Sequence, residues 1–134
     1  MTEKEIKSEF VSNYFENFKQ ILKSPKLRVY AIELPVKTND FNGYADIVLI
    51  NENKERFYDM QMIVLEFKKS KVSYGPIDQL HLYTSIIHKK FYRRNKTVGM
   101  LVAPRFSNYE IEQCKSYGYH ALMLDENFNM KFIA

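Results

Sequence analysis

The chain has 134 residues, of which 46% are apolar and 27% charged, and these are the proportions of a single globular domain over 1–134. Its one cysteine, Cys114, excludes an internal disulfide, and no apolar run approaches the roughly 20 residues that a membrane-spanning helix needs, so we expect a cytoplasmic protein with no membrane partner. The formal charge of +4 is compatible with a polyanionic partner.

Residues 3–23 carry the first predicted element, an amphipathic helix. Its apolar side chains recur at steps of three and four residues, at Ile6, Phe10, Tyr14, Phe18, Ile21 and Leu22. Thr2 is suited to cap the helix, with Glu5 three residues on, and Pro25 follows just past its end. We therefore expect one helix with one buried face at the start of the chain.

Three strand-like runs follow this helix. Residues 27–36 (LRVYAIELPV) alternate between apolar and polar types, with Glu33 as a charge at an edge or on the outer face. Residues 44–50 (YADIVLI) and 62–68 (MIVLEFK) are apolar runs, and each carries charge where a buried strand normally has none. The polar stretch 51–61 between them predicts that these two runs form an antiparallel pair.

The charges in this strand pair face one another. Pairing around 51–61 places Ile50 opposite Met62. The same register places Asp46 opposite Glu66, with the paired side chains about 5 Å apart. Two facing carboxylates repel each other and resist burial. A divalent cation removes both penalties, and Mg²⁺ or Mn²⁺ fits because hard cations prefer oxygen ligands.

Lys68 lies two residues after Glu66 and therefore on the same face of the strand. The set predicts a metal held by Asp46, Glu66 and the Phe67 carbonyl. Lys68 would orient a metal-bound water for hydrolysis of a phosphodiester. Taken singly, each run is better explained by an exposed strand end or by a surface ion pair of little energy. The matching register of the two runs favours the metal site.

The second half of the chain alternates between helices and strands. We expect a helix over 76–92, a strand over 96–103, a helix over 107–117 capped by Ser107 and ended by Gly118, a strand over 119–124 and a short strand over 128–133. Together with the strand-rich first half, this order predicts an α/β fold in which helices flank a mixed β-sheet.

The helix over 76–92 begins with a polar pair. Gln79 and Tyr83 lie at i and i+4, one turn apart on one face. Tyr83 is as well explained by core packing as by a contact with nucleic acid. Lys69 and Lys71 lie in the loop before this helix, beside the proposed metal, where they would contact phosphates or simply face solvent.

Basic residues gather at the end of the same helix. Lys89, Lys90, Arg93 and Arg94 complement the helix dipole there. The same cations would bind phosphates, and the aromatic residues between them would stack on unpaired bases. The two interpretations do not exclude each other.

Taken in order, these motifs resemble those of the PD-(D/E)XK nuclease superfamily, in its RecB-like branch, and in particular the nuclease domain of NucS-type endonucleases. Asp46 matches the first acid, and EFK at 66–68 matches the second acid, spacer and lysine. QLHLY at 79–83 resembles the Q-x-x-x-Y element, and VGMLVAP at 98–104 resembles the strand that follows it. Ala45 stands in place of the proline that gives the pattern its name, a replacement that many members tolerate.

The resemblance implies a restriction-endonuclease-like fold and a Mg²⁺- or Mn²⁺-dependent nuclease that binds and cuts DNA. It implies that Gln79 assists near the metal-bound water or the DNA strand. It also implies an acidic residue on the first helix that completes the site, for which Glu9 fits best and Glu16, two helical turns on, is the runner-up. By analogy with relatives of this size, a homodimer is expected.

Two other functions stay open at the level of the sequence. One is a nucleic-acid-binding module on a nuclease fold without catalysis. The other is a structural or inhibitory protein that binds a partner through the basic end of the helix over 76–92. The intact set of Asp46, Glu66 and Lys68 favours the nuclease, because only catalysis needs all three together. DNA and RNA, and endo- and exonucleolytic cleavage, are all compatible with these motifs.

Overall fold

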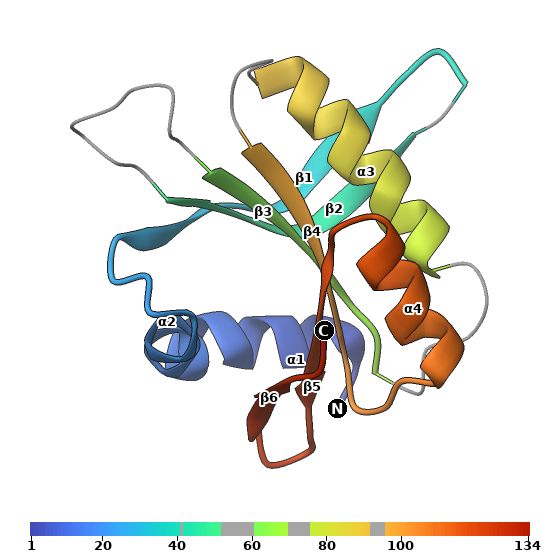
Figure 1. Cartoon of the computed structure of the whole chain (residues 1–134). Coiled ribbons are helices and arrows are strands. Elements are labelled where there is room, and N and C mark those ends of the chain that lie inside the picture. Colours follow the sequence, from blue (N-terminus) through green and yellow to red (C-terminus); the bar gives the residue numbers. More distant parts are fainter. Residues whose placement is uncertain (41, 52–60, 70–75, 92–95) are drawn as a thin grey trace.

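The computed structural model describes residues 1–40, 42–51, 61–69, 76–91 and 96–134, and its helices cover both faces of one sheet (Figure 1). The six strands of the described residues are β1 (Leu27–Lys37), β2 (Asn42–Asn51), β3 (Gln61–Phe67), β4 (Lys96–Ala103), β5 (His120–Leu124) and β6 (Met130–Phe132), and they lie side by side in that order. β3, β4 and β5 run parallel to one another, while the other neighbours are antiparallel. The predicted α/β fold, with a mixed sheet flanked by helices, is therefore confirmed.

The predicted N-terminal helix is also confirmed, but it contains a π-helical turn. It consists of α1 (Glu3–Glu9), the π-helical turn η1 (Phe10–Tyr14) and α2 (Phe15–Leu22). The Thr2 hydroxyl accepts a hydrogen bond from the Glu5 main chain, and the Glu5 carboxylate accepts one from the Thr2 main chain, so the expected capping box is present. Lys23, with a φ of 53°, ends α2 in the left-handed region.

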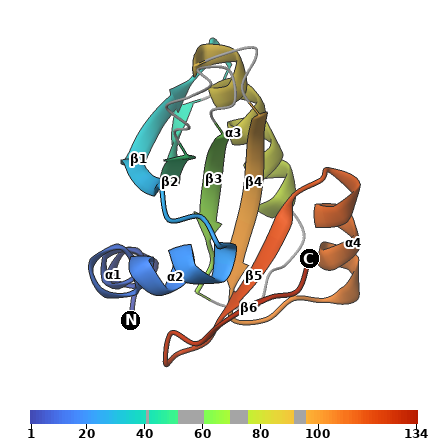
Figure 2. The same ribbon diagram turned by 60° about the vertical axis from the view of Figure 1, so that its left-hand side comes forward.

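Two apolar layers join the helices to the sheet. α1, η1 and α2 lie on one face, and α3 (Pro76–Phe91) and α4 (Asn108–Ser116) lie on the other (Figure 2). The first layer is built around Phe10, whose ring centroid lies 5.3 Å from those of Phe18 and Phe67 in edge-on packing. In the second layer, Leu80, Tyr83 and Ile87 of α3 pack against β3 and β4. Val64 of β3 and Leu101 of β4 belong to the same buried cluster.

The elements of the second half begin and end close to their predicted positions. β4 spans the predicted residues, and α3 begins at Pro76 as expected. Ser107 caps α4, because its hydroxyl accepts a hydrogen bond from the Glu110 main chain, and Gly118 follows α4 with a φ of 71°. None of the described helices combines the length and the apolar composition needed to cross a membrane.

Gly99 in β4 lies where the sheet touches α3 and Tyr119. A Cβ atom at this position would lie 2.9 Å from Cδ2 of Tyr119 and 3.0 Å from Cγ of Leu80. Both side chains are buried, so Gly99→Ala should lower the free energy of unfolding by about 1–3 kcal/mol through overpacking. Denaturant unfolding measures the effect, with Lys96→Ala, a substitution at an exposed position of the same strand, as the control. Equal unfolding midpoints for the two variants would contradict it.

Candidate active site

The strand pair that carries the predicted carboxylates has the register expected from the sequence. β2 pairs with β3 in antiparallel fashion, with Ile50 opposite Met62. The same register, continued to the end of the ladder, brings Asp46 next to Glu66. Oδ2 of Asp46 accepts a hydrogen bond from the main-chain N–H of Phe67 at 2.8 Å, so Asp46 is tied to the strand that carries Glu66.

The regular alternation of side chains breaks at Asp46. Alternation from Val48 would put Ala45 on the opposite face of the sheet, yet both lie in the same buried cluster. In the paired strand β1, Glu33 has a φ of 53°, a left-handed conformation that costs a non-glycine residue roughly 1–3 kcal/mol. β1 and β2 are therefore irregular at this point, and both Asp46 and Glu33 contact Lys7 of α1.

Glu66 is a buried carboxyl group with one oxygen atom left without a partner. The residue is 4% exposed, its Oε2 has no hydrogen-bond partner among the described residues, and its Oε1 lies 3.7 Å from Nζ of Lys68. Burial, followed by the charge of Asp46, raises the pKa of Glu66 to about 8, against the opposing charge of Lys68. Without a further cation, Glu66 therefore holds a proton near neutral pH, and any cation bound at the carboxylate must displace that proton.

Lys7 is a site residue that the sequence analysis missed. It is 9% exposed, and its Nζ lies 2.9 Å from Oδ1 of Asp46 and 3.4 Å from Oε1 of Glu33. Burial alone would lower the pKa of Lys7, but the hydrogen bonds and charges of Asp46 and then of Glu33 outweigh it and raise that pKa above its ordinary value. Helical spacing held a signal, since Lys7 comes one residue after Ile6 and three before Phe10, beside the buried stripe.

The acids predicted to complete the site from the first helix make other contacts. Oε1 of Glu9 accepts a hydrogen bond from Nδ2 of Asn13, one turn along the same helical segment, at 2.8 Å. Glu16 is exposed and forms an ion pair within α2. Among the described residues of the first helix, the side chain in contact with Asp46 is Lys7, so an ammonium group stands where a carboxylate was expected.

Gln79 and Tyr83, which were predicted to share one face of a helix, contact each other on α3. Nε2 of Gln79 donates a hydrogen bond to the Tyr83 hydroxyl at 2.7 Å, which holds the half-buried amide in place. Tyr83 itself is 3% exposed and packs in the core, so its ring is not open to stacking on a base. The buried position of Tyr83 fits the interpretation in which it supports Gln79 through this hydrogen bond, and its contact with nucleic acid stays a prediction.

The predicted basic contacts fall at two ends of the sheet. Lys69 is exposed just past the end of β3, and its main-chain N–H donates a hydrogen bond to Oε1 of Glu3 at 3.2 Å. Lys89 and Lys90 are exposed in the last turn of α3, which runs back along the sheet to the opposite end (Figure 1). The 16 residues of α3 span about 24 Å, so these two lysines lie far from Lys68. Outside the described residues lie Lys71, Arg93 and Arg94.

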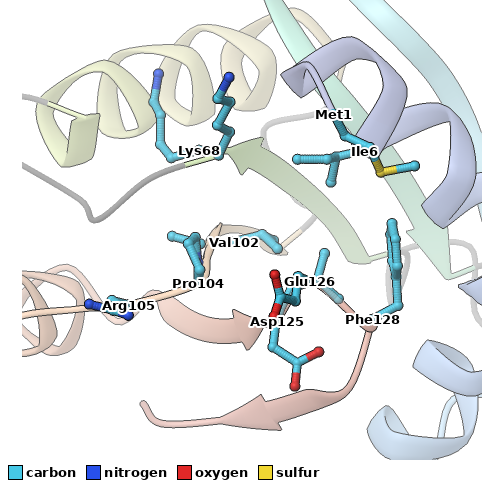
Figure 3. A pocket seen from close by; sticks show the side chains of 12 residues that line it. Met1, Ile6, Lys68, Val102, Pro104, Arg105, Asp125, Glu126 and Phe128 are labelled. Atoms are coloured by element: carbon cyan, nitrogen blue, oxygen red, sulfur yellow. The ribbon is translucent and has the colours of Figure 1, made fainter.

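A cavity of about 480 Å³ opens beside Lys68, at the edge where β3, β4 and β5 end (Figure 3). Lys68, Arg105 and Phe128 reach it from the segments that follow these three strands. Its lining combines apolar side chains, such as Val102, with basic and acidic ones, such as Glu126. Ligands of α/β sheets commonly bind at this edge, so the candidate catalytic residues lie beside the place where a substrate is expected.

The carboxylates of Asp46 and Glu66, which lie side by side, are the oxygen groups that could hold a metal here, and the Phe67 carbonyl is the third ligand predicted from the sequence. No group of three or more His, Cys, Asp or Glu side chains suited to a metal ion occurs within the described ranges. Mg²⁺ commonly takes one or two carboxylates and keeps several of its waters. Structural zinc is usually enclosed by four protein ligands. The donor set therefore suits Mg²⁺ better than zinc.

The fold is similar to that of three solved structures. A repair endonuclease from Pyrococcus abyssi matches with a TM-score of 0.66 over 88% of this chain and 46% of its own, at 19% identity. The EndoMS–dsDNA2 complex gives a TM-score of 0.60 over 85% of this chain and 42% of its own, at 20% identity. EndoMS in its apo form gives 0.57 over 93% and 46%, at 15% identity. No protein-family model matches the chain, and the comparison with curated proteins found no match.

At this level of identity the likeness defines the fold. The described domain has a nuclease-like α/β fold, and this chain spans less than half the length of each of the three proteins. Asp46, Glu66 and Lys68 meet at the end of its β2–β3 pair. The fold and these three side chains together are the basis for a functional proposal.

Proposed function

We propose that this chain is a metal-dependent nuclease of the PD-(D/E)XK type that hydrolyses DNA phosphodiester bonds at Asp46, Glu66 and Lys68. The observation that carries the proposal is the buried Oε2 of Glu66, which has no partner within the described structure and belongs to a carboxyl group beside a second one. An unpaired buried carboxylate is costly, and strongly perturbed acidic groups cluster at functional sites. The likeness of the fold to a repair endonuclease supports the same interpretation.

One Mg²⁺ or Mn²⁺ ion would satisfy this carboxylate pair. Asp46, Glu66 and the Phe67 carbonyl would hold it, and waters would complete its coordination. When bound, the ion would supply positive charge to the phosphate and lower the pKa of a nucleophilic water. Oε2 of Glu66 fits this role, because it is a buried carboxyl oxygen without a hydrogen-bond partner among the described residues, and it would become an anionic ligand once the proton of Glu66 is displaced.

Lys68 and Gln79 would act on the substrate side of the carboxylate pair. The Lys68 ammonium is partly exposed and lies 3.7 Å from Oε1 of Glu66. It can therefore hold the scissile phosphate or orient the attacking water while it stays near the carboxylate. Gln79 is fixed by its hydrogen bond to Tyr83, and its amide oxygen can accept a hydrogen bond from a water or a base.

The bound strand would continue over the cavity beside Lys68. Lys69 and Arg105 supply cations there, as is usual for groups that hold phosphates. One face of the Phe128 ring stacks on Tyr14, and the part of the ring that lines the same cavity would offer an apolar surface to one sugar or base. Contacts farther along the DNA are proposed for Lys71, Lys89, Lys90, Arg93 and Arg94. A homodimer is proposed by analogy alone.

Cleavage assays test the proposal. Labelled single-stranded, duplex, flapped and four-way-junction DNA would be incubated with the purified chain in Mg²⁺, Mn²⁺ or EDTA. We expect cleavage only with a divalent ion, and its loss in Asp46→Ala and Lys68→Ala, because these changes remove a metal ligand and the water-orienting cation. Glu112→Gln and Lys115→Ala, which alter an exposed ion pair on α4, are the matched controls and should cleave as the parent does.

Binding without cleavage would overturn the nuclease proposal and favour a nucleic-acid-binding module on a nuclease fold. One observation favours this alternative: the Lys7 ammonium already neutralises Asp46 at 2.9 Å. The alternative predicts DNA binding that is independent of metal and unchanged in Asp46→Ala and Lys68→Ala.

A further inference from the structure

We infer, on the premise of the proposed metal site, that Lys7 is a built-in cation that competes with the metal ion for Asp46. In the metal-free protein the ammonium group takes the place of the ion, and metal binding moves that group toward Glu33. Lys7 is thus a positioning residue that sets how tightly the site binds metal.

Asp46 is engaged at both oxygens before any metal binds. Its Oδ1 accepts a hydrogen bond from Nζ of Lys7 at 2.9 Å, and its Oδ2 accepts one from the Phe67 main chain at 2.8 Å. An ion ligated by Asp46 would lie about 2 Å from a carboxylate oxygen, and therefore within a few ångströms of the ammonium. Like charges this close repel strongly where water is scarce, so the ion and the ammonium cannot both keep their closest positions.

Glu33 offers the ammonium a second place. Its Oε1 lies 3.4 Å from Nζ of Lys7, a looser contact than the one to Asp46, and its side chain is 51% exposed, so it has room to close on the ammonium. The Lys7 side chain is largely buried, and it needs a charged partner wherever it moves. Glu33 also has a left-handed φ, which is energetically unfavourable for a residue other than glycine. The strained residue is thus the one whose carboxylate lies beside Lys7.

The charges of this cluster fit one divalent ion better than two. Asp46, Glu66 and Glu33 supply three carboxyl groups, while Lys7 and Lys68 supply two ammonium groups. A carboxylate in the position of Lys7 would attract a second ion, whereas an ammonium repels it. We therefore expect a single ion, bound more weakly than the carboxylates alone would bind it.

Metal binding by the full chain without DNA tests the role of Lys7. Lys7→Met keeps an unbranched apolar side chain but removes the charge, and it should bind Mn²⁺ about tenfold more tightly than the parent, as measured by calorimetry and by the electron paramagnetic resonance of free Mn²⁺. Glu33→Gln should weaken the binding of Mn²⁺. Of the two carboxylates that contact the Lys7 ammonium, only Asp46 would then remain, so the ammonium would compete more strongly with the ion. Lys4→Met, at an exposed lysine on the same helix, should leave the affinity unchanged.

A double variant separates competition from a simple change of charge. If Lys7 transmits the effect, Glu33→Gln should cost less Mn²⁺ affinity in the Lys7→Met background than in the parent. Equal or weaker Mn²⁺ affinity in a folded Lys7→Met protein would overturn the inference and leave Lys7 with a structural role alone. Should Lys7→Met fail to fold, unchanged or tighter binding by Glu33→Gln would overturn it instead, and weaker binding would support it.

These outcomes also separate the role of Lys7 from the proposed nuclease. Mn²⁺ binding that is lost in Asp46→Ala but unaffected by Lys7→Met would overturn the role of Lys7 and keep the metal site. No Mn²⁺ binding by any variant would overturn both. Binding that appears only in Lys7→Met would support competition in its strongest form, in which the ammonium blocks the site.

Discussion

Glu66→Gln should make the metal-free protein more stable at alkaline pH and remove its nuclease activity. Burial and the charge of Asp46 raise the pKa of Glu66 from 4.5 to about 8. The folded state therefore keeps a proton that the unfolded state loses between these two values, and the free energy of unfolding falls as the pH rises through that range. Because one pKa unit corresponds to about 1.4 kcal/mol, the loss in the parent would be on the order of 4 kcal/mol by about pH 8.

Denaturant unfolding in EDTA, from about pH 5 to about pH 8, measures this effect. The parent should lose stability across the range, whereas Glu66→Gln has no group to ionise at this position and should give a flatter profile. Glu112→Gln removes an exposed acid on α4 and should follow the parent. Parallel profiles for the parent and Glu66→Gln would show that the pKa of Glu66 is not raised.

The same substitution should lower cleavage by roughly a thousandfold or more, because a metal ion supplies several kcal/mol of transition-state stabilisation and a neutral amide holds it poorly. Mg²⁺ should restore the stability of the parent near pH 8 but change that of Glu66→Gln little. Functional sites commonly contain groups that lower the stability of the fold but are needed for activity, and Glu66 would fit this pattern. Full cleavage by Glu66→Gln would place the chemistry elsewhere.

The strand register could be predicted from the sequence because the side-chain period of a strand is fixed. Ile50 is the last residue of one apolar run and Met62 is the first of the next, on either side of a polar connection. Their pairing is confirmed. The same register, continued past Ile47 opposite Leu65, brings Asp46 next to Glu66, while the break in alternation at Asp46 was not predictable from the side-chain period. The ends of α4 were predictable for a similarly local reason. A hydroxyl group accepts a hydrogen bond from an unpaired main-chain N–H at the start of a helix, and glycine readily adopts the left-handed conformation that follows its end.

A π-helical turn separates the two acids between which the sequence pattern could not choose on the first helix. Glu9 and Glu16 are two turns apart, which puts them on one face of a regular α-helix. η1 (Phe10–Tyr14) lies between them, and its wider turn rotates the faces of α1 and α2 relative to each other. No glycine or proline occurs in this segment, so the sequence carries no local sign of the turn.

Lys7 and Glu33 depend on tertiary contacts that periodicity does not describe. Lys7 and Asp46 are 39 positions apart in the chain, and their contact depends on how α1 docks against the sheet. The left-handed φ of Glu33 is rare for a residue other than glycine and persists only where the surroundings impose it. Both features therefore follow from the assembled fold and not from any local pattern.

Phe10→Ala should lower the free energy of unfolding by about 3–5 kcal/mol. Phe10 is fully buried, and its ring packs edge-on against Phe18 and Phe67 at 5.3 Å. The change would leave a cavity between η1 and the sheet. Chemical denaturation measures the loss, with Ile21→Ala at an exposed position of α2 as the control, expected within about 0.5 kcal/mol of the parent. A similar loss in both variants would mean that the Phe10 contacts do not anchor the helix.

The same substitution should loosen the candidate site more than the centre of the sheet. Phe67 packs against Phe10 and donates its main-chain N–H to Asp46, while α1, which Phe10 anchors, carries Lys7 to the same carboxylate. Amide hydrogen exchange at Phe67 should therefore speed up in Phe10→Ala by more than exchange at Leu101 in β4, because local opening needs less free energy than global unfolding. Equal acceleration at both amides would show that Phe10 affects the site only through global stability.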